Sequence, residues 1–299
     1  MSEKPKLFEL ELPLPNQELE ALGRRLIGFE RRYEALGRAF QLLLDPESVL
    51  AWAGKHHGKN LKIAEVLAER YPLVILHGDV GTGKTAFAEA AADRLCRQPR
   101  PEGTLMKLST RVRGVGKVGE LSHLINEAFG SVEATVGKHR SAILIIDEAD
   151  SLAASRDRGQ SHHEDKAGVN TLIQKIDDIR RLHGRLLVFL CTNRLSTIDP
   201  ALRRRAGHTE RFSRPSDAER RALLEFDTEG LGIGAAEIDE LVALTAAKGR
   251  VPAFTFSDLR TRLIPEAVLQ AYPTRPLTGR DLIAAAKSLD PSPAIEDED

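Results

Sequence analysis

The stretch His77-Gly78-Asp79-Val80-Gly81-Thr82-Gly83-Lys84-Thr85 decides the fold, because residues 78–85 match G-x-x-x-x-G-K-[ST], the pattern of a phosphate-binding loop. Its three glycines allow backbone conformations that a Cβ would forbid, so that successive N–H groups can point at a phosphate. The motif requires a strand before it and a helix after it. Residues 73–76 are an apolar run typical of a short buried strand, and the alanine-rich residues 85–95 favour a helix. The sequence therefore predicts a nucleotide-binding loop.

The residues of this loop are expected to share the work of holding a nucleoside triphosphate. Lys84 supplies a compact cation for the β- and γ-phosphates, and the Thr85 hydroxyl is a ligand for Mg²⁺. Residues 56–59 could contact adenine or ribose through their place before the core, which the sequence does not decide. We therefore expect ATP and Mg²⁺ as ligands. Further contacts are expected from the rest of the loop and the first turn of the helix: Gly78, Asp79, Val80, Gly81, Thr82, Gly83 and Ala86.

Two adjacent carboxylates, Asp147 and Glu148, follow the apolar run 142–146, which has the pattern of a strand covered on both faces. At a strand end each carboxylate must be solvated or paired, which makes them poor structural choices. Beside a bound Mg-nucleotide, Asp147 can hold Mg²⁺ through water, while Glu148 can orient and deprotonate the attacking water. Asn193 closes the next buried strand and can contact the γ-phosphate or position the same water; an ordinary turn asparagine is the alternative.

Three consecutive arginines, residues 203–205, follow this strand. For any one of them a solvated basic helix end is the ordinary explanation. As a trio after Asn193, one of them is expected to reach the γ-phosphate of a neighbouring subunit as an arginine finger. The candidates are Arg204 and Arg205, and an arginine acting in this way predicts a homo-hexameric ring.

Strands that alternate with helices predict an α/β fold, a parallel sheet with the nucleotide at its carboxyl edge. From residue 216 onward the pattern changes to helices, without a convincing buried strand. We expect four regions: a short amino-terminal segment (1–60), a large α/β ATPase subdomain (61–215), a small helical lid (216–290) and an acidic disordered tail (291–299).

The composition narrows the class of protein. In 299 residues, 41% hydrophobic and 29% charged content are ordinary for a globular chain with a sizeable core. A net charge of −1 gives no basic field, so direct contact with nucleic acid is not expected. The longest apolar run, residues 186–191, is far too short to cross a membrane. The two cysteines and the charged start of the chain favour a cytoplasmic protein.

Together, the phosphate loop, Asp147-Glu148, Asn193 and the arginine cluster resemble an AAA+ ATPase over roughly residues 74–289. Residues 146–156, and more specifically 169–181, are similar to the pachytene-checkpoint ATPases, also called the thyroid-receptor-interacting-protein-13 group. This resemblance implies a phosphate-loop sheet domain with a helical lid, and an ATP-driven hexamer that remodels or partially unfolds a HORMA-domain protein. The short amino terminus resembles bacterial relatives, which occur in anti-phage nucleotide-signalling operons.

The AAA+ resemblance also suggests two further sites. An AAA+ ring turns one loop into its central channel, and this loop reads 112–118 here, without an aromatic residue. Val115 at its tip, with Arg113 and Lys117, is expected to grip the client chain. Arg260 is matched by position to the sensor-2 arginine of the lid, although no glycine precedes it.

Two other functions fit part of the pattern. A DNA-linked AAA+ loader or initiator is opposed by the near-neutral charge and the lack of a recognisable DNA-binding module. An ATP-gated scaffold that barely turns over is opposed by the intact Glu148.

Overall fold

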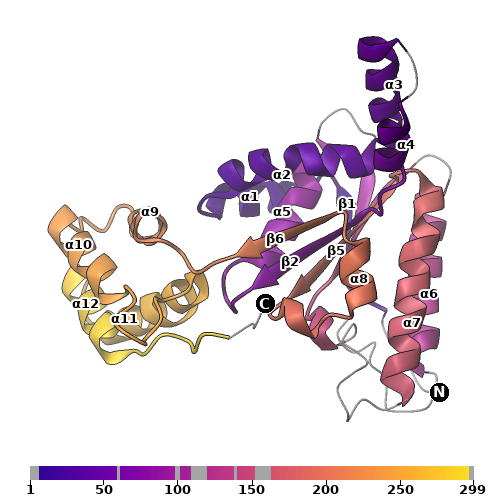
Figure 1. Ribbon diagram of the computed structural model, residues 1–299. Coiled ribbons are helices and arrows are strands. Elements are labelled where there is room, and N and C mark those ends of the chain that lie inside the picture. The colour runs from indigo at the N-terminus through magenta and orange to yellow at the C-terminus, as the bar shows by residue number, and fades with distance from the viewer. Residues whose placement is uncertain are drawn as a thin grey trace.

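The computed structural model describes residues 7–58, 61–97, 102–108, 120–137, 140–151 and 163–295. Its centre is a six-stranded sheet in the order β1-β3-β4-β5-β2-β6 (Figure 1). Neighbouring strands are parallel except for β1, which runs antiparallel to β3. The strands are β1 (Phe8–Leu14), β2 (Leu73–Gly78), β3 (Gly103–Leu108), β4 (Ser141–Ile146), β5 (Leu186–Thr192) and β6 (His208–Phe212).

Helices cover both faces of this sheet, with α1, α2 and α5 on one side and α6 and α7 on the other (Figure 1). Strand β2 shows why: Leu73 and Ile75 join one apolar core, while Val74 and Leu76 join the other. A strand buried on both faces is expected to be a nearly continuous apolar run, as residues 73–76 are. The helices of this part are α1 (Gln17–Arg25), α2 (Phe29–Leu44), α3 (Pro46–His57), α4 (Lys62–Ala68), α5 (Lys84–Cys96), α6 (Glu120–Val136), α7 (His163–Asp178) and α8 (Pro200–Arg205).

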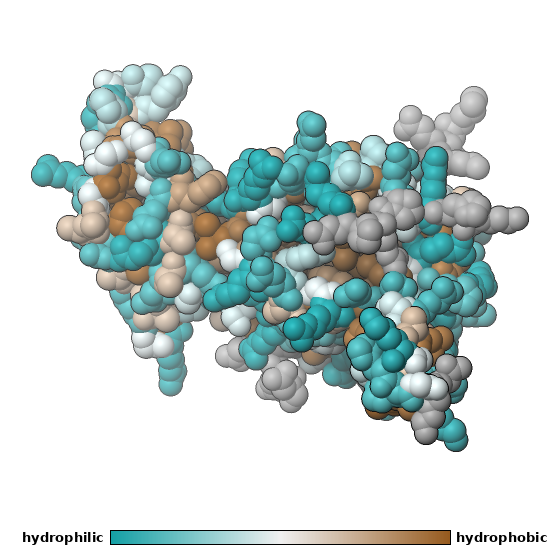
Figure 2. Space-filling model, turned by 90° about the horizontal axis from the view of Figure 1, so that it is seen from above, coloured by the Kyte–Doolittle hydropathy of each residue, from teal (hydrophilic) through white to brown (hydrophobic). Residues whose placement is uncertain are grey.

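The lid after residue 216 has an apolar core of its own, built around residues such as Leu223, Leu241, Leu259 and Leu282. It forms a separate lobe, joined to the larger body by a narrow waist (Figure 2). No helix in the described ranges is long and apolar enough to cross a membrane. The lid helices are α9 (Asp217–Asp227), α10 (Ala235–Leu244), a π-helical turn (Asp258–Leu263), α11 (Ile264–Ala271) and α12 (Gly279–Ser288).

The amino-terminal region is built into the large subdomain. Strand β1 pairs with β3, and the backbone N–H of Asn16 donates to Asp93 of α5 at 2.6 Å. Phe40 of α2 is fully buried and packs edge-on against Phe189 of β5, with ring centroids 5.6 Å apart. Strand β1 and helices α1 and α2 therefore share a core with the sheet, whereas Val49 and Ala53 of α3 form a small separate apolar cluster with Ala64 of α4.

Two features differ from the sequence expectation. Strand β6 was not predicted, because only Phe212 of its five residues is buried and the others are polar, as suits the edge of a sheet. Residues 291–295, expected to begin a disordered tail, run from the lid back to the carboxyl edge of the sheet (Figure 1). There the backbone N–H of Ile295 donates to Asp79 at 3.2 Å. We call residues 291–295 the strap.

Candidate nucleotide-binding site

The phosphate loop lies between β2 and α5 at the carboxyl edge of the sheet. Gly78, Gly81 and Gly83 have φ angles of 129°, 73° and 92°, a region of backbone conformation that disfavours side chains. A Cβ on Gly78 would lie 2.2 Å from the carbonyl oxygen of Phe212. The glycines therefore let the loop turn tightly against β6 and keep its backbone open to a ligand.

The lid rests directly on this loop. The backbone N–H of Ser257 donates to the carbonyl oxygen of Gly81 at 3.1 Å. A Cβ on Gly81 would lie 2.7 Å from the Cβ of Ser257 and 2.8 Å from Oγ1 of Thr255. Only glycine allows this contact.

We expect Gly81→Ala to push the lid off the loop and to weaken ATP binding by about 10-fold or more, because strain and collision act together. Gly83→Ala is the matched comparison: its φ is also positive, but a Cβ there has no neighbour within 4 Å. Isothermal titration calorimetry should therefore show the larger loss for Gly81→Ala. Equal losses in the two variants would contradict a role for the lid contact.

Lys84 brings together residues that are far apart in the sequence. Its Nζ donates to the carbonyl oxygens of Gly78 (2.9 Å) and Asp79 (2.8 Å) and to Oδ1 of Asn193 (3.0 Å). Burial of this side chain lowers the pKa of Lys84, and neighbouring carboxylates oppose that effect. The Lys84 ammonium, at the start of α5, thus lies beside the Asn193 amide, which follows β5, the strand adjacent to β2.

Thr85 and Asp147 form the oxygen-rich side of the site. The Thr85 hydroxyl donates to Asp147, with Oγ1 lying 3.0 Å from Oδ1 and 2.9 Å from Oδ2. A hydroxyl beside a carboxylate is a donor set that suits Mg²⁺. Glu148 follows with a φ of 47°, an unusual conformation for a residue other than glycine. Such strain gathers at functional sites, and the Glu148 side chain is exposed at this edge.

Sequence analysis missed Lys107, which is close to the same carboxylate. Its Nζ lies 2.8 Å from Glu9, 3.5 Å from Glu89 and 3.4 Å from Asp147. Burial opposes its charge, but the hydrogen bond with Glu9 and the charges of Asp147 and Glu89 raise the pKa of Lys107. The lysine therefore stays charged and balances a cluster of acidic groups. The signal was hidden because it arises only when β1, β3 and β4 are side by side.

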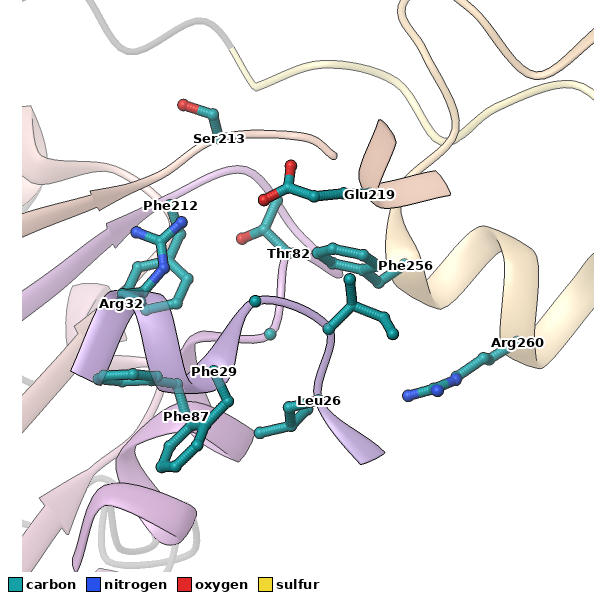
Figure 3. A pocket seen from close by; sticks show the side chains of 13 residues that line it. Leu26, Phe29, Arg32, Thr82, Phe87, Phe212, Ser213, Glu219, Phe256 and Arg260 are labelled. Carbon is teal, nitrogen blue, oxygen red and sulfur yellow. The ribbon is translucent and has the colours of Figure 1, made fainter. Parts of the chain in front are cut away.

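A cleft beside the phosphate loop is lined by the turn between α1 and α2, by α5 and by the lid (Figure 3). Ile27 and Gly28 come from the turn, Thr82 from the loop, and Phe256 and Arg260 from the lid. These lining residues combine apolar surface with polar groups, which is typical of a site for a small molecule.

Arg260 extends from a lid helix toward this cleft (Figure 3). Its guanidinium is held by Asp227, with distances of 2.6 Å from Nε to Oδ2 and 2.8 Å from Nη2 to Oδ1. His56 and His57 belong to the segment that could contact adenine or ribose according to the sequence. They lie at the end of α3 and are not among the residues that line this cleft.

The two candidate finger residues have different surroundings. Arg205 forms a double ion pair with Asp177 of α7, at 2.5 Å from Nε to Oδ1 and 2.9 Å from Nη2 to Oδ2. Arg204 is exposed and has no ion pair within the described part of the chain. The expected channel residues Arg113, Val115 and Lys117 lie outside the described residues.

A largely parallel sheet with this loop after β2, an acidic pair directly after β4 and a helical lid defines an AAA ATPase. Residues 74–214 match the family model described as ATPase family associated with various cellular activities. The fold class, the AAA+ resemblance and the expectation of an ATP-hydrolysing enzyme are thereby confirmed.

Individual relatives identify the particular family of AAA ATPases to which the chain belongs. CD-NTase-associated protein 6 of Escherichia coli (strain KTE188) is 49% identical over 98% of this chain and 99% of its own. A chain in the E. coli MS115-1 HORMA:CdnC:Trip13 complex aligns with a TM-score of 0.90 and 38% identity, covering 98% of this chain and 100% of that one. The structure of Rhizobiales Trip13 aligns with a TM-score of 0.73 and 34% identity, covering 96% of this chain and 99% of that one. The chain belongs to the CD-NTase-associated protein 6 family of AAA ATPases.

Proposed function

We propose that this ATPase is a ring-shaped homo-hexamer that uses Mg-ATP hydrolysis to remodel a HORMA-domain protein in an anti-phage signalling system. The similarity to a chain in a HORMA:CdnC:Trip13 complex carries the proposal. It extends over 98% of this chain, so it includes the lid as well as the ATPase subdomain. A relative that shared only the nucleotide site would give no indication of the client protein. This relative aligns with a TM-score of 0.90 over nearly all of the chain.

We assign the following roles to the residues of the nucleotide site. Lys84, which donates to three oxygens of its own chain, can turn its ammonium to the β- and γ-phosphates. Thr85 and Asp147 would hold Mg²⁺, which neutralises phosphate charge when bound. Glu148 accepts the proton of the attacking water, and Asn193 orients that water or the γ-phosphate.

The remaining contacts come from the lid and from a neighbouring subunit. The cleft that Ile27 and Phe256 help to line would take the adenine base, with Arg260 as the sensor-2 residue at its lid side. Arg204 or Arg205 would reach the γ-phosphate of the next subunit. Val115, Arg113 and Lys117 would contact the client in the channel.

The test uses a HORMA-domain protein closed around a fluorescent peptide. With ATP, the native ATPase should accelerate peptide release by at least about 10-fold, since remodelling replaces a slow spontaneous opening. Glu148→Gln, which should still bind ATP, is the control and should leave release at its spontaneous rate. A native protein that hydrolyses ATP without accelerating release would contradict the proposed client.

A further inference from the structure

A carboxylate lies inside the phosphate loop itself. Asp79 follows Gly78, and its side chain is only 13% exposed. Its Oδ1 accepts the backbone N–H groups of Val80 (2.9 Å) and Ile295 (3.2 Å). A negative charge at this position repels the polyphosphate that the loop has to bind, unless a nearby cation compensates for it.

Arg214 supplies that cation. It follows β6, its side chain is 12% exposed, and its Nε lies 2.6 Å from Oδ2 of Asp79. The rest of the guanidinium is also used: Nη1 donates to the carbonyl oxygen of Ala253 at 2.5 Å, and Nη2 donates to that of Ser292 at 2.7 Å. One side chain thus joins the phosphate loop, the lid and the strap. Its orientation is fixed by acceptors on all three.

The strap is itself anchored to the lid. Ser292 donates to the Asp258 carboxylate twice, from Oγ at 2.6 Å and from its backbone N–H at 3.2 Å. Asp258 is 1% exposed and also accepts from the backbone N–H of Thr255 at 2.9 Å. The strap, the lid and Asp79 therefore hold Arg214 from different sides. A cleft of about 250 Å³ beside this network is lined by Asn193 as well as by Asp79 and Arg214.

We propose that Arg214 is a positioning residue for ATP binding, which neutralises Asp79 inside the phosphate loop and is held in place by the lid and the strap. The inference rests on the nucleotide site proposed above. The expected consequence is electrostatic: without Arg214, the Asp79 carboxylate loses its ion-pair partner, and its negative charge acts more strongly on the phosphates. The loss of affinity should therefore grow with the negative charge of the ligand.

The test measures binding of ATP, ADP and adenosine by calorimetry without Mg²⁺. Arg214→Gln should weaken ATP binding by at least about 10-fold, ADP binding by less, and adenosine binding by less than about twofold. A merely structural role in seating the lid would weaken all three ligands alike, and that result would overturn the proposal. A native protein that bound none of the ligands would instead refute the nucleotide site.

Asp79→Asn is the matched variant, because the amide oxygen can still accept from Val80 and Ile295. It should bind ATP several-fold more tightly than the native protein, since Arg214 then faces the phosphates alone. The double variant Asp79→Asn/Arg214→Gln should return to within about threefold of native affinity. A double variant as weak as Arg214→Gln would show that Asp79 is not the reason for the loss.

Two further variants guard against misfolding and test the strap. Arg214→Lys keeps the charge with fewer hydrogen bonds, so it should bind ATP within about threefold of native. A loss as large as that of Arg214→Gln would overturn the charge argument.

A chain ending at residue 290 lacks two of the contacts around Asp79 and Arg214, those from Ser292 and Ile295. It should bind ATP about two- to fivefold more weakly, whereas unchanged or tighter binding would remove the strap from the proposal.

Discussion

Glu148→Gln is expected to bind ATP within about threefold of the native affinity and to hydrolyse it at least about 100-fold more slowly. Glutamine keeps the size and polarity of the side chain but cannot accept a proton from water. The Glu148 carboxylate is exposed and makes no ion pair within the described residues, so the exchange breaks no ion pair among them. Steady-state ATPase assays and nucleotide titrations measure the two quantities separately.

Asp150→Asn provides the control for this variant. It removes one negative charge two residues away, from a carboxylate that accepts from the Thr192 hydroxyl at 3.2 Å, and an amide can keep that hydrogen bond. Its turnover should stay within about fivefold of native. If Glu148→Gln retained more than a tenth of the native turnover, or if both variants lost turnover equally, Glu148 would not be the base.

The sequence predicts best those parts of the site whose chemistry demands a local pattern. Gly78, Gly81 and Gly83 are needed for backbone angles that other residues avoid, and they stand next to Lys84 in the chain. Residues 73–76 of strand β2 are all apolar because both faces of the strand are covered there. Such requirements produce glycine and apolar patterns within a short stretch of sequence, which is why the sequence predicts the loop, its strand and its helix together.

Contacts between distant segments leave no such mark. Arg214 and Asp79 are 135 positions apart, and nothing in either neighbourhood shows that they pair. Lys107 lies near the end of a strand, where a lysine is ordinarily solvated, and its role arises only because β3 lies between β1 and β4. The strap was hidden for a related reason: its composition is typical of a disordered tail, whereas its position depends on Arg214 and Asp258.

The two arginine-finger candidates differ in their contacts within their own subunit. Arg205 is bound to Asp177 within its own subunit, and Arg204 projects from the same helix without an ion pair in the described ranges. Asp177→Asn removes only the partner of Arg205. If Arg205 has a structural role, this variant and Arg205→Ala should lower the melting temperature similarly. A finger variant, by contrast, should keep its melting temperature and its ATP affinity within a few-fold while losing turnover.

Two inactive variants are expected to restore one another when they are mixed. A finger variant, Arg204→Ala or Arg205→Ala, keeps its own Glu148 but cannot serve its neighbour, whereas Glu148→Gln keeps the arginine but cannot deprotonate water. In a ring with head-to-tail interfaces, a site regains both groups wherever a finger-variant subunit borders a Glu148→Gln subunit on the donating side. Random one-to-one mixing should therefore recover about a quarter of native turnover if the sites act independently.

Two controls accompany this experiment. Differently labelled subunits verify that mixed rings form, and Lys84→Ala replaces Glu148→Gln as a second partner, since it also keeps the arginine. Mixed rings that stay inactive with both partners, for both arginines, would show that neither Arg204 nor Arg205 acts across the subunit interface.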